Sequence, residues 1–257
     1  MRSQSVACFT FDNMGEAAEV GAGRRLGPIE GAAEPSLAVG YPNLYALTAA
    51  HGVRATFFVE GWNGVHHPEA VATIVERGHE LAMHGWAHES WSTLDAAAER
   101  DLAERATAAL ARAGGVRPRG FRAPGGSRTA ATERVLREIG YEYDASLGDG
   151  MQPRRLATGL AQIPFVWPCV DGFHYLRPDP VAPATVRDRW LAKLAAVAEG
   201  GGLFLLVCHA FLTGVDPEKL AALDAVMEAA VRDPRVTVRT AGEIAAELPG
   251  AAGSPAT

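Results

Sequence analysis

The sequence predicts an α/β fold, and more specifically a distorted barrel of seven or eight strand–helix units. Short apolar, strand-like segments alternate with longer Ala- and Leu-rich segments, which is typical of a parallel sheet with helical crossovers. Glycines and prolines stand at the ends of many of these segments. The 257 residues can bury a sizeable core. We expect residues 1–249 to form one domain and residues 250–257 to form a disordered tail.

The expected strands are short runs rich in apolar, β-branched or aromatic residues, and turn-forming or polar residues bound them. In chain order they cover residues 5–11, 54–59, 80–83, 120–122, 162–167, 203–208 and 236–239. Residues 15–40, which follow the first strand, are Gly-rich and too irregular for a helical or a strand period. We expect a loop there.

The expected helices show helical composition together with residues that begin or end a helix. In chain order they cover residues 43–51, 68–77, 95–113, 129–139, 184–198 and 217–231. Pro68 suits the first turn of its helix, and Gly78 stands just past the end. The helix over 95–113 is the strongest, because it is Ala- and Leu-rich throughout and is closed by Gly114 and Gly115.

Composition excludes several classes of function. The net charge of −6 provides no basic surface for nucleic acid. No apolar run approaches membrane-spanning length, and no apolar signal-peptide core precedes the first strand. The cysteines Cys8, Cys169 and Cys208 lie in apolar contexts, where we expect small buried side chains rather than disulfides. We therefore expect a cytoplasmic protein without a membrane or nucleic-acid partner.

His84 and His88 form the most informative pair in the chain. At a spacing of four positions, two imidazoles on a helical turn face the same side and can converge on one cation. They follow the expected strand over 80–83, at the end of the strand where α/β folds place their chemistry. Chance also produces such spacings among eight histidines, so the pair alone does not decide between a metal site and no site.

Three further groups of polar residues follow expected strands. Asp12 and Asn13 follow the first strand, Arg122 ends the fourth, and His209 follows the strand over 203–208. Each has an ordinary structural interpretation, respectively as a turn or helix cap, an ion-pair partner and a core histidine. One active site better explains why all of these groups and the histidine pair stand at the ends of expected strands.

The order of these motifs resembles the polysaccharide deacetylases of the NodB-homology type, or carbohydrate esterase family 4. The motifs are Thr10-Phe11-Asp12, Ala55-Thr56-Phe57-Phe58-Val59, His84-x3-His88, Arg122-Ala123-Pro124-Gly125 and Leu206-Val207-Cys208-His209. They extend over roughly residues 6–248, and the segment around His84 is most similar to the intracellular, amidase-like branch. The resemblance implies a distorted (β/α) barrel and metal-assisted hydrolysis of an amide.

The resemblance also implies roles for the residues of these motifs. His84 and His88 would hold a divalent metal, with zinc as the expected ion, together with an acidic residue of the first motif. Asp12 would be the general base, and Arg122 would orient it and balance its charge. His209 would protonate the leaving nitrogen.

Four further residues are candidates for the substrate pocket or its support. Asp171 would be the acidic partner that tunes the pKa of His209. Trp86 and Trp167 would form walls of the pocket, although a packing role is equally open for both. Pro124, beside Arg122 in its motif, would also line the pocket.

The first motif departs from the family pattern at the expected metal ligand. The family has two acidic residues there, and this chain has Asp12-Asn13-Met14. Three replacements are open. In the first, the side-chain oxygen of Asn13 would coordinate the metal. In the second, Asp12 itself would coordinate it. In the third, Glu16 or Glu19 would reach the metal from the loop that follows.

These inferences lead to one main hypothesis and two alternatives. The main one is a metal-dependent, deacetylase-like hydrolase of a non-peptide C–N amide bond, with a small amide or amino-sugar-like molecule as substrate. The first alternative is a lyase, isomerase or cyclase that uses the metal as a Lewis acid. The second is a binding protein with a decayed active site. The oligomeric state is open, with a homo-oligomer included.

Overall fold

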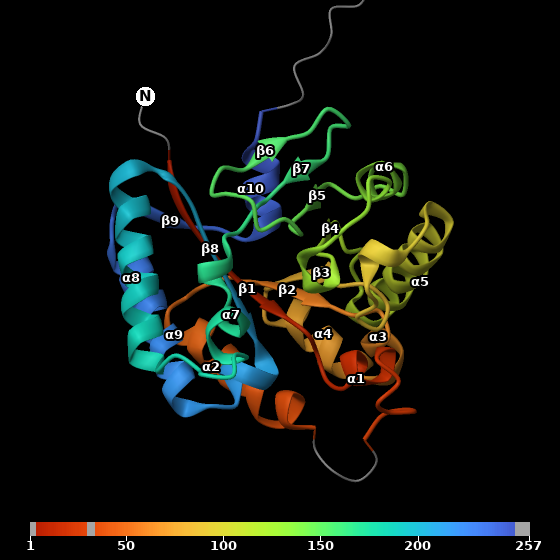
Figure 1. Cartoon of the computed structure of the whole chain (residues 1–257), viewed down its shortest axis with the longest axis horizontal. Coiled ribbons are helices and arrows are strands. Elements are labelled where there is room, and N and C mark those ends of the chain that lie inside the picture. The colour runs from red at the N-terminus through yellow and green to blue at the C-terminus, as the bar shows by residue number, and fades with distance from the viewer. Residues whose placement is uncertain (1–3, 30–33, 250–257) are drawn as a thin grey trace, which may run out of the picture.

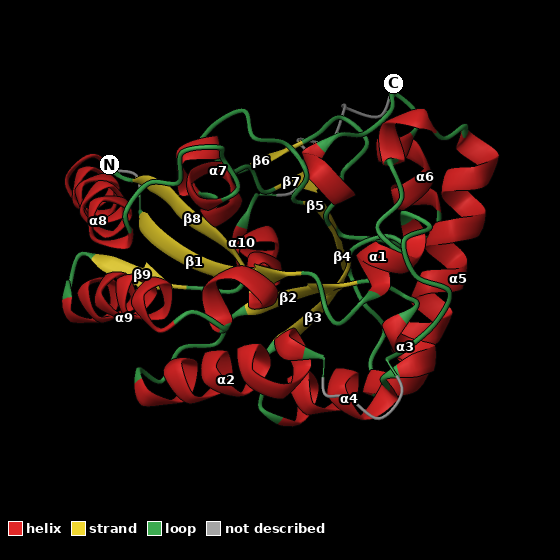
Figure 2. Ribbon diagram, turned by 60° about the horizontal axis from the view of Figure 1, so that its bottom comes forward, coloured by secondary structure: helices red, strands yellow, loops and turns green. Residues whose placement is uncertain are grey.

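A curled, mostly parallel sheet forms the centre of the fold, and helices surround it (Figures 1 and 2). The computed structural model describes residues 4–29 and 34–249, so the tail expected at residues 250–257 lies outside the described residues. The strands are β1 Ser5–Asp12, β2 Thr56–Val59, β3 Glu80–Met83, β4 Gly120–Phe121, β5 Tyr143–Asp144, β6 Arg154–Arg155, β7 Ala161–Gln162, β8 Gly202–His209 and β9 Val236–Val238.

The sheet forms a distorted barrel, which confirms the predicted fold class. The strand order is β6-β7-β5-β4-β3-β2-β1-β8, and β9 pairs with β1. Every pairing is parallel except that of β6 with β7. The two end strands of this path are not paired with each other along their length. A single parallel bridge between Val170 and Val207 instead brings the segment after β7 against β8.

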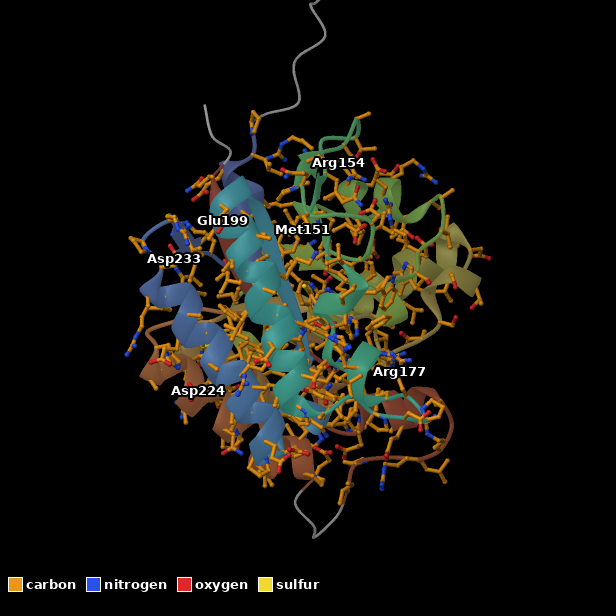
Figure 3. The ribbon with its side chains drawn as sticks, turned by 60° about the vertical axis from the view of Figure 1, so that its left-hand side comes forward. Met151, Arg154, Arg177, Glu199, Asp224 and Asp233 are labelled. Atoms are coloured by element: carbon orange, nitrogen blue, oxygen red, sulfur yellow. The ribbon has the colours of Figure 1, made fainter. Side chains whose placement is uncertain are left out.

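The longer helices surround the sheet on three sides. The helices are α1 Ala17–Gly21, α2 Tyr41–Ala50, α3 Asn63–His66, α4 Pro68–Glu76, α5 Ala96–Gly114, α6 Thr132–Glu138, α7 Asp171–Tyr175, α8 Pro183–Gly200, α9 Pro217–Arg232 and α10 Ala241–Glu247. In Figure 2, α8 and α9 lie on one side, α2 and α4 along a second, and α5 on a third. Figure 3 shows α8 beside α9, with Glu199 and Asp224 on their exposed surface.

The two long strands β1 and β8 fix the geometry at the carboxyl end of the sheet. They pair over eight residues, from Ser5 opposite Gly202 to Asp12 opposite His209. Nearly every residue of both strands is buried, as expected for a parallel sheet covered on both faces. A one-residue slip would turn Asp12 to the other face of the sheet. Burial of both strands therefore sets the position of Asp12 relative to His209.

Helix boundaries follow the predicted signals closely where caps are present. The α5 helix begins after Asp95, whose side chain accepts the backbone N–H of Ala98 at 2.8 Å. It ends at Gly115, whose φ of 68° is the left-handed conformation that glycine adopts freely. Pro68 opens α4, as predicted.

Several predictions of local structure were wrong. The segment over 15–40 contains α1 and a π-helical turn, Ser36–Gly40, rather than loop alone. The strand expected at 162–167 is paired only over Ala161–Gln162, and α6 is shorter than the helix expected at 129–139. The two-residue strands β5 and β6 were missed, because two residues are too few to show a period.

The cysteines and the hydropathy of the helices bear on two further predictions. Cys8, Cys169 and Cys208 are buried and free, as predicted. Within residues 4–29 and 34–249, no helix is both long enough and apolar enough to cross a bilayer.

His79, directly before β3, is a neutral histidine built into the core. Its ring is buried and stacks on Tyr45. Its Nδ1 accepts the N–H of Ala55 at 3.3 Å, which leaves Nε2–H to donate to the Thr48 hydroxyl at 3.3 Å. Burial, with Arg77 and Arg54 nearby, lowers the pKa of His79 from 6.5 to about 4. Protonation of Nδ1 would set two N–H groups against each other.

The stability of the fold should therefore fall in acid through His79. Because the pKa of the folded state lies below that of the unfolded chain, the stabilisation is complete above pH 6.5 and is lost as the pH falls toward 4. We expect a loss of about 2 kcal/mol, less than the full shift implies because one edge of the ring faces a surface cavity. Urea unfolding of wild type and His79→Gln across this range measures it. An equally steep pH dependence in the variant would contradict the assignment.

Candidate active site

One cleft at the carboxyl end of the sheet brings together most of the predicted site residues. Its volume is about 820 Å³. The predicted residues that line it are Asp12, Asn13, His84, His88, Arg122, Trp167 and His209. They come from the ends of β1, β3, β4 and β8 and from the segment after β7. Segments far apart in the sequence therefore contribute to one surface.

The two histidines lie close together, and one of them has a defined free nitrogen. Their ring centroids are 5.1 Å apart. The Nδ1 of His84 lies 2.8 Å from the backbone carbonyl of Arg122, to which it donates its hydrogen. This leaves Nε2 with a lone pair, the arrangement seen in metal-binding histidines. Burial lowers the pKa of His84 to about 3, although Asp12 opposes the effect, so the ring is neutral at neutral pH.

The sequence predicted that the two histidines lie on a helical turn, and this prediction was wrong. His84 follows β3, and Gly85 and His88 both have positive φ, 76° and 62°. The carboxylate of Glu89 closes this turn by accepting the N–H groups of Trp86 at 3.0 Å and Ala87 at 2.7 Å. The reversal at Gly85 thus replaces helical spacing as the reason that the two rings meet.

Asp12 and Arg122 form a buried ion pair. Arg122 Nη1 lies 2.6 Å from Asp12 Oδ1 and also donates to the Thr10 hydroxyl at 2.8 Å. Its Nε donates to the carbonyl of Ala145 at 3.0 Å, and the guanidinium lies 4.1 Å over the Phe58 ring. The guanidinium balances the buried charge of Asp12 and fixes its position.

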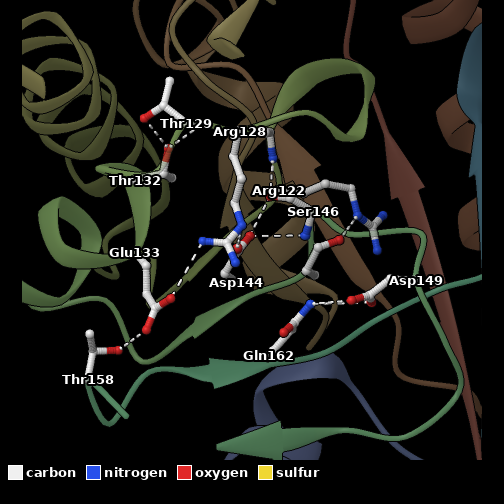
Figure 4. Close-up of polar contacts among 12 residues, drawn as sticks. Arg122, Arg128, Thr129, Thr132, Glu133, Asp144, Ser146, Asp149, Thr158 and Gln162 are labelled. Atoms are coloured by element: carbon white, nitrogen blue, oxygen red, sulfur yellow. Dashed lines mark hydrogen bonds and ion pairs between the residues drawn. The ribbon is translucent and has the colours of Figure 1, made fainter. Parts of the chain in front are cut away.

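A network of polar contacts holds the segment that follows Arg122 (Figure 4). The backbone N–H of Ala123 donates to the Ser146 hydroxyl at 2.8 Å. Ser146 in turn contacts the carboxylate of Asp144, which Arg128 approaches at 3.2 Å. This network ties the loop after β4 to the loop after β5, and it was not predicted from sequence.

His209 is held by a buried carboxylate. Its Nδ1 lies 2.5 Å from Asp171 Oδ1, and its backbone N–H donates to Oδ2 at 2.7 Å. Asp171 also accepts from Thr213 at 2.6 Å and does not itself line the cleft. Burial opposes protonation of His209, but Asp171 outweighs it, so the pKa of His209 lies above its usual value. Its Nε2 is the nitrogen left for the cleft.

Asn13 is held by a carboxylate that the sequence analysis missed. Glu60, directly after β2 and fully buried, accepts from Asn13 Nδ2 at 2.6 Å. It also accepts from the Met14 N–H and from Asn63 Nδ2, both at 3.1 Å. Burial raises the pKa of Glu60 to about 8, and these hydrogen bonds oppose the rise. The one feature of the sequence that could have marked Glu60 as a site residue is its position directly after an expected strand.

The structure narrows the choice of a third metal ligand. Glu16 is turned toward the backbone N–H of Ile29 and toward His67, and Glu19 pairs with Arg25. Within the described ranges, no three His, Cys, Asp or Glu side chains are grouped so that they could hold a metal ion. The candidate ligands that line the cleft are His84 and His88 together with Asp12 and Asn13 of the first motif. These nitrogen and oxygen donors fit a divalent ion, and the charged one among them, Asp12, is already paired with Arg122.

Three of the four residues predicted for the pocket or its support, Trp86, Pro124 and Asp171, do not line the cleft. Trp86 instead faces α5, where the guanidinium of Arg105 lies 3.5 Å over its ring. Pro124 is buried and packs near Gly85. Trp167 does line the cleft, and 45% of it is exposed. The pocket-wall interpretation fits Trp167 alone of the two tryptophans.

Comparisons with known proteins agree with the order of these motifs. A sequence model of the polysaccharide deacetylase family matches residues 3–143. A solved structure from Mycobacterium smegmatis, assigned to the polysaccharide deacetylases, is 32% identical, with a TM-score of 0.86 over 99% of this chain and 96% of that one. An allantoinase structure shares the fold, with a TM-score of 0.79 and 22% identity over 95% of this chain and 90% of that one.

Curated relatives match over a shorter stretch. The peptidoglycan deacetylase of Helicobacter pylori is 31% identical over 109 residues, which make up 42% of this chain and 37% of the relative. A chitin deacetylase from Pestalotiopsis is 33% identical over 38% of this chain and 34% of its own length. The chain therefore spans only about a third of the length of these relatives.

Restoring an acid at position 13 should destabilise the protein unless Glu60 changes as well. Above pH 8, where Glu60 is ionised, Asn13→Asp would place a second carboxylate at the 2.6 Å contact with Glu60, and we expect a loss of about 2 kcal/mol. Glu60→Gln in the same chain should recover most of that loss by restoring an amide–carboxylate pair. Urea unfolding of both single variants and the double variant measures the coupling. A fully stable Asn13→Asp single variant would contradict it.

Proposed function

We propose that this chain, which belongs to the polysaccharide deacetylase family, hydrolyses a non-peptide C–N amide bond of a small molecule. The observation that carries the proposal is the pairing of Asp12 with His209 across β1 and β8. Each of these two side chains has its own buried partner of opposite charge character, Arg122 and Asp171. Both line the same cleft as the histidine pair.

The two side chains suit complementary proton transfers. Asp12 accepts a proton from the attacking water, whose oxygen forms the new bond to the amide carbon. His209 donates a proton to the nitrogen as the C–N bond breaks, so that a neutral amine leaves. The raised pKa of His209 supports the donor role, because it keeps more of the ring protonated near neutral pH. Arg122 keeps Asp12 in position throughout.

A divalent metal fits beside these groups. His84 and His88, with the amide oxygen of Asn13, would hold it, and zinc is the expected ion because two imidazoles suit it. When bound, such an ion lowers the pKa of water toward neutrality and polarises a carbonyl. With neutral donors alone, we expect weaker binding than in a site that contains a carboxylate.

The size of the cleft supports a small substrate. A volume of about 820 Å³ lies within the range of small-molecule pockets, roughly 300–1,000 Å³. Gly21 and Ala22, at the end of α1, line it together with residues of the segment after β7. Walls from two segments far apart in the sequence thus limit the length of molecule that can enter.

The catalytic assignment is tested by substitution of Asp12 and His209. Asp12→Asn and His209→Ala should each lower kcat/KM by about a hundredfold or more, because each removes a proton-transfer group. Release of acetate from a panel of N-acetylated amines and amino sugars measures activity. Asp224→Asn on the exposed face of α9 is the control. Full activity of Asp12→Asn would show that Asp12 is not the base.

The metal assignment has a test that does not depend on activity. Protein prepared without a polyhistidine tag and dialysed against zinc should retain about one equivalent by elemental analysis. His84→Gln and His88→Gln should each abolish retention, whereas His51→Gln, directly after α2 and outside the cleft, should not. Less than about a tenth of an equivalent in the wild type would rule out the site.

A further inference from the structure

We propose that the amine half of the substrate is an apolar group of about the size of an aromatic ring, rather than a sugar. The inference rests on the proposed hydrolysis, because His209 marks the side of the cleft on which the amine leaves. It extends that function by naming the chemistry of the leaving group.

Exposed apolar side chains gather at this cleft. Among residues 4–29 and 34–249, nine large apolar side chains are exposed, and four of them line the cleft. They are Trp167, Phe173, Leu176 and Phe211, with exposed fractions of 45%, 42%, 63% and 42%. These four include every aromatic side chain in that exposed set. Single exposed apolar residues are ordinary, but such a cluster at a cleft indicates a binding surface.

The cluster surrounds the proposed proton donor. The Phe211 ring centroid lies 5.4 Å from that of His209. A Cβ at Gly172 would lie 3.4 Å from Leu176 Cδ1 and 3.8 Å from His209 Cε1. Leu176 and His209 therefore border the same space, which the missing side chain of Gly172 leaves open. A group attached to the nitrogen that His209 protonates would occupy this space.

Trp167 forms a further part of the apolar lining. Its ring meets Phe165 edge to face, with centroids 5.3 Å apart, and Phe165 also lines the cleft. Two glycines, Gly126 and Gly148, lie against the Trp167 ring, with no room for a Cβ at Gly148. The ring is thus held in position while 45% of the residue is exposed and it contributes to the lining of the cleft, as in a platform for an aromatic group.

Among the polar side chains that line the cleft, Asp12 and Arg122 are engaged with each other and Glu89 accepts the N–H groups that close its own turn, whereas Arg24 follows α1 and Ser90 follows Glu89. A sugar ring placed against the four exposed apolar side chains would lose water from its hydroxyls without gaining partners from them, which is unfavourable for each hydroxyl. An aromatic or branched alkyl group gains from the same burial. The chemistry of the walls therefore favours an apolar amine.

Competition between two acetamides tests the inference. N-benzylacetamide and N-acetylglucosamine release the same acetate and differ in the amine half. We expect kcat/KM to be at least about tenfold higher for N-benzylacetamide. Leu176→Ser, and Phe211→Ser as a second variant, should lower this ratio about tenfold. Val231→Ser, an equally apolar and exposed site on α9 outside the cleft, is the matched control. A higher kcat/KM for the sugar, with a ratio that these variants do not move, would overturn the inference.

Binding separates the inference from the proposed function. Calorimetric titration of His209→Ala with each acetamide should show binding of N-benzylacetamide, weakened about tenfold by adding Leu176→Ser. Binding without turnover in the wild type would leave the inference standing and reject the hydrolase. Hydrolysis of N-acetylglucosamine without binding of N-benzylacetamide would do the reverse. A shift of Leu176→Ser from oligomer to monomer in sedimentation, with unchanged binding, would assign the cluster to a contact between copies and overturn the inference.

Discussion

Arg122 is the residue on which the candidate site depends. Its guanidinium holds Asp12 and Thr10 of β1, its Nε holds the carbonyl of Ala145, and its own carbonyl accepts from His84. One residue thus sets the position of the proposed base and the tautomer of the first metal-binding histidine. Since a buried guanidinium is costly without partners, the surrounding sheet must supply all of these contacts together. The site and the barrel are consequently one structural unit.

The position of each group follows from where strands end. Asp12 and His209 are register partners in two strands that are buried almost throughout, and a slip would exchange the side chains that pack on the two faces of the sheet. The two members of the proposed acid–base pair therefore hold their separation because the core enforces it. Other segments add the partners that tune each group, such as Asp171 at the start of α7.

Strand ends were predictable from sequence, but the contacts between loops were not. Apolar runs followed by polar residues are sufficient to place Asp12, His84, Arg122 and His209 at one edge of the barrel. The orientation of Trp86 could not be predicted in the same way, because it depends on the positive φ of Gly85 and the neighbouring turn. Resemblance to a family identifies the positions of a motif in the sequence. The backbone conformation of the turn determines which of those side chains face the cleft.

Glu60 is a residue whose role could not be predicted from sequence, because it depends on a contact with a distant part of the chain. In sequence it is a single acid after a strand, with no motif around it. Its role depends on Asn13, which reaches it only because residue 13 adopts a φ of 64° at the end of β1. The departure from the family pattern at position 13 is thus accompanied by a carboxylate from another strand, and the two positions must be considered together.

Every carboxylate around the cleft is committed to a local partner. Asp12 is bound to Arg122, Asp171 to His209, Glu60 to Asn13, and Glu89 to its own turn. Beside these pairs the cleft presents the imidazoles of His84 and His88, the Asn13 amide, the side chains of Arg24 and Ser90, and an apolar wall. In such surroundings charge is poorly screened, so a charge that develops on the substrate interacts strongly with the few oriented groups beside it. The same low polarity that would exclude a sugar ring would strengthen the proton transfers assigned to Asp12 and His209.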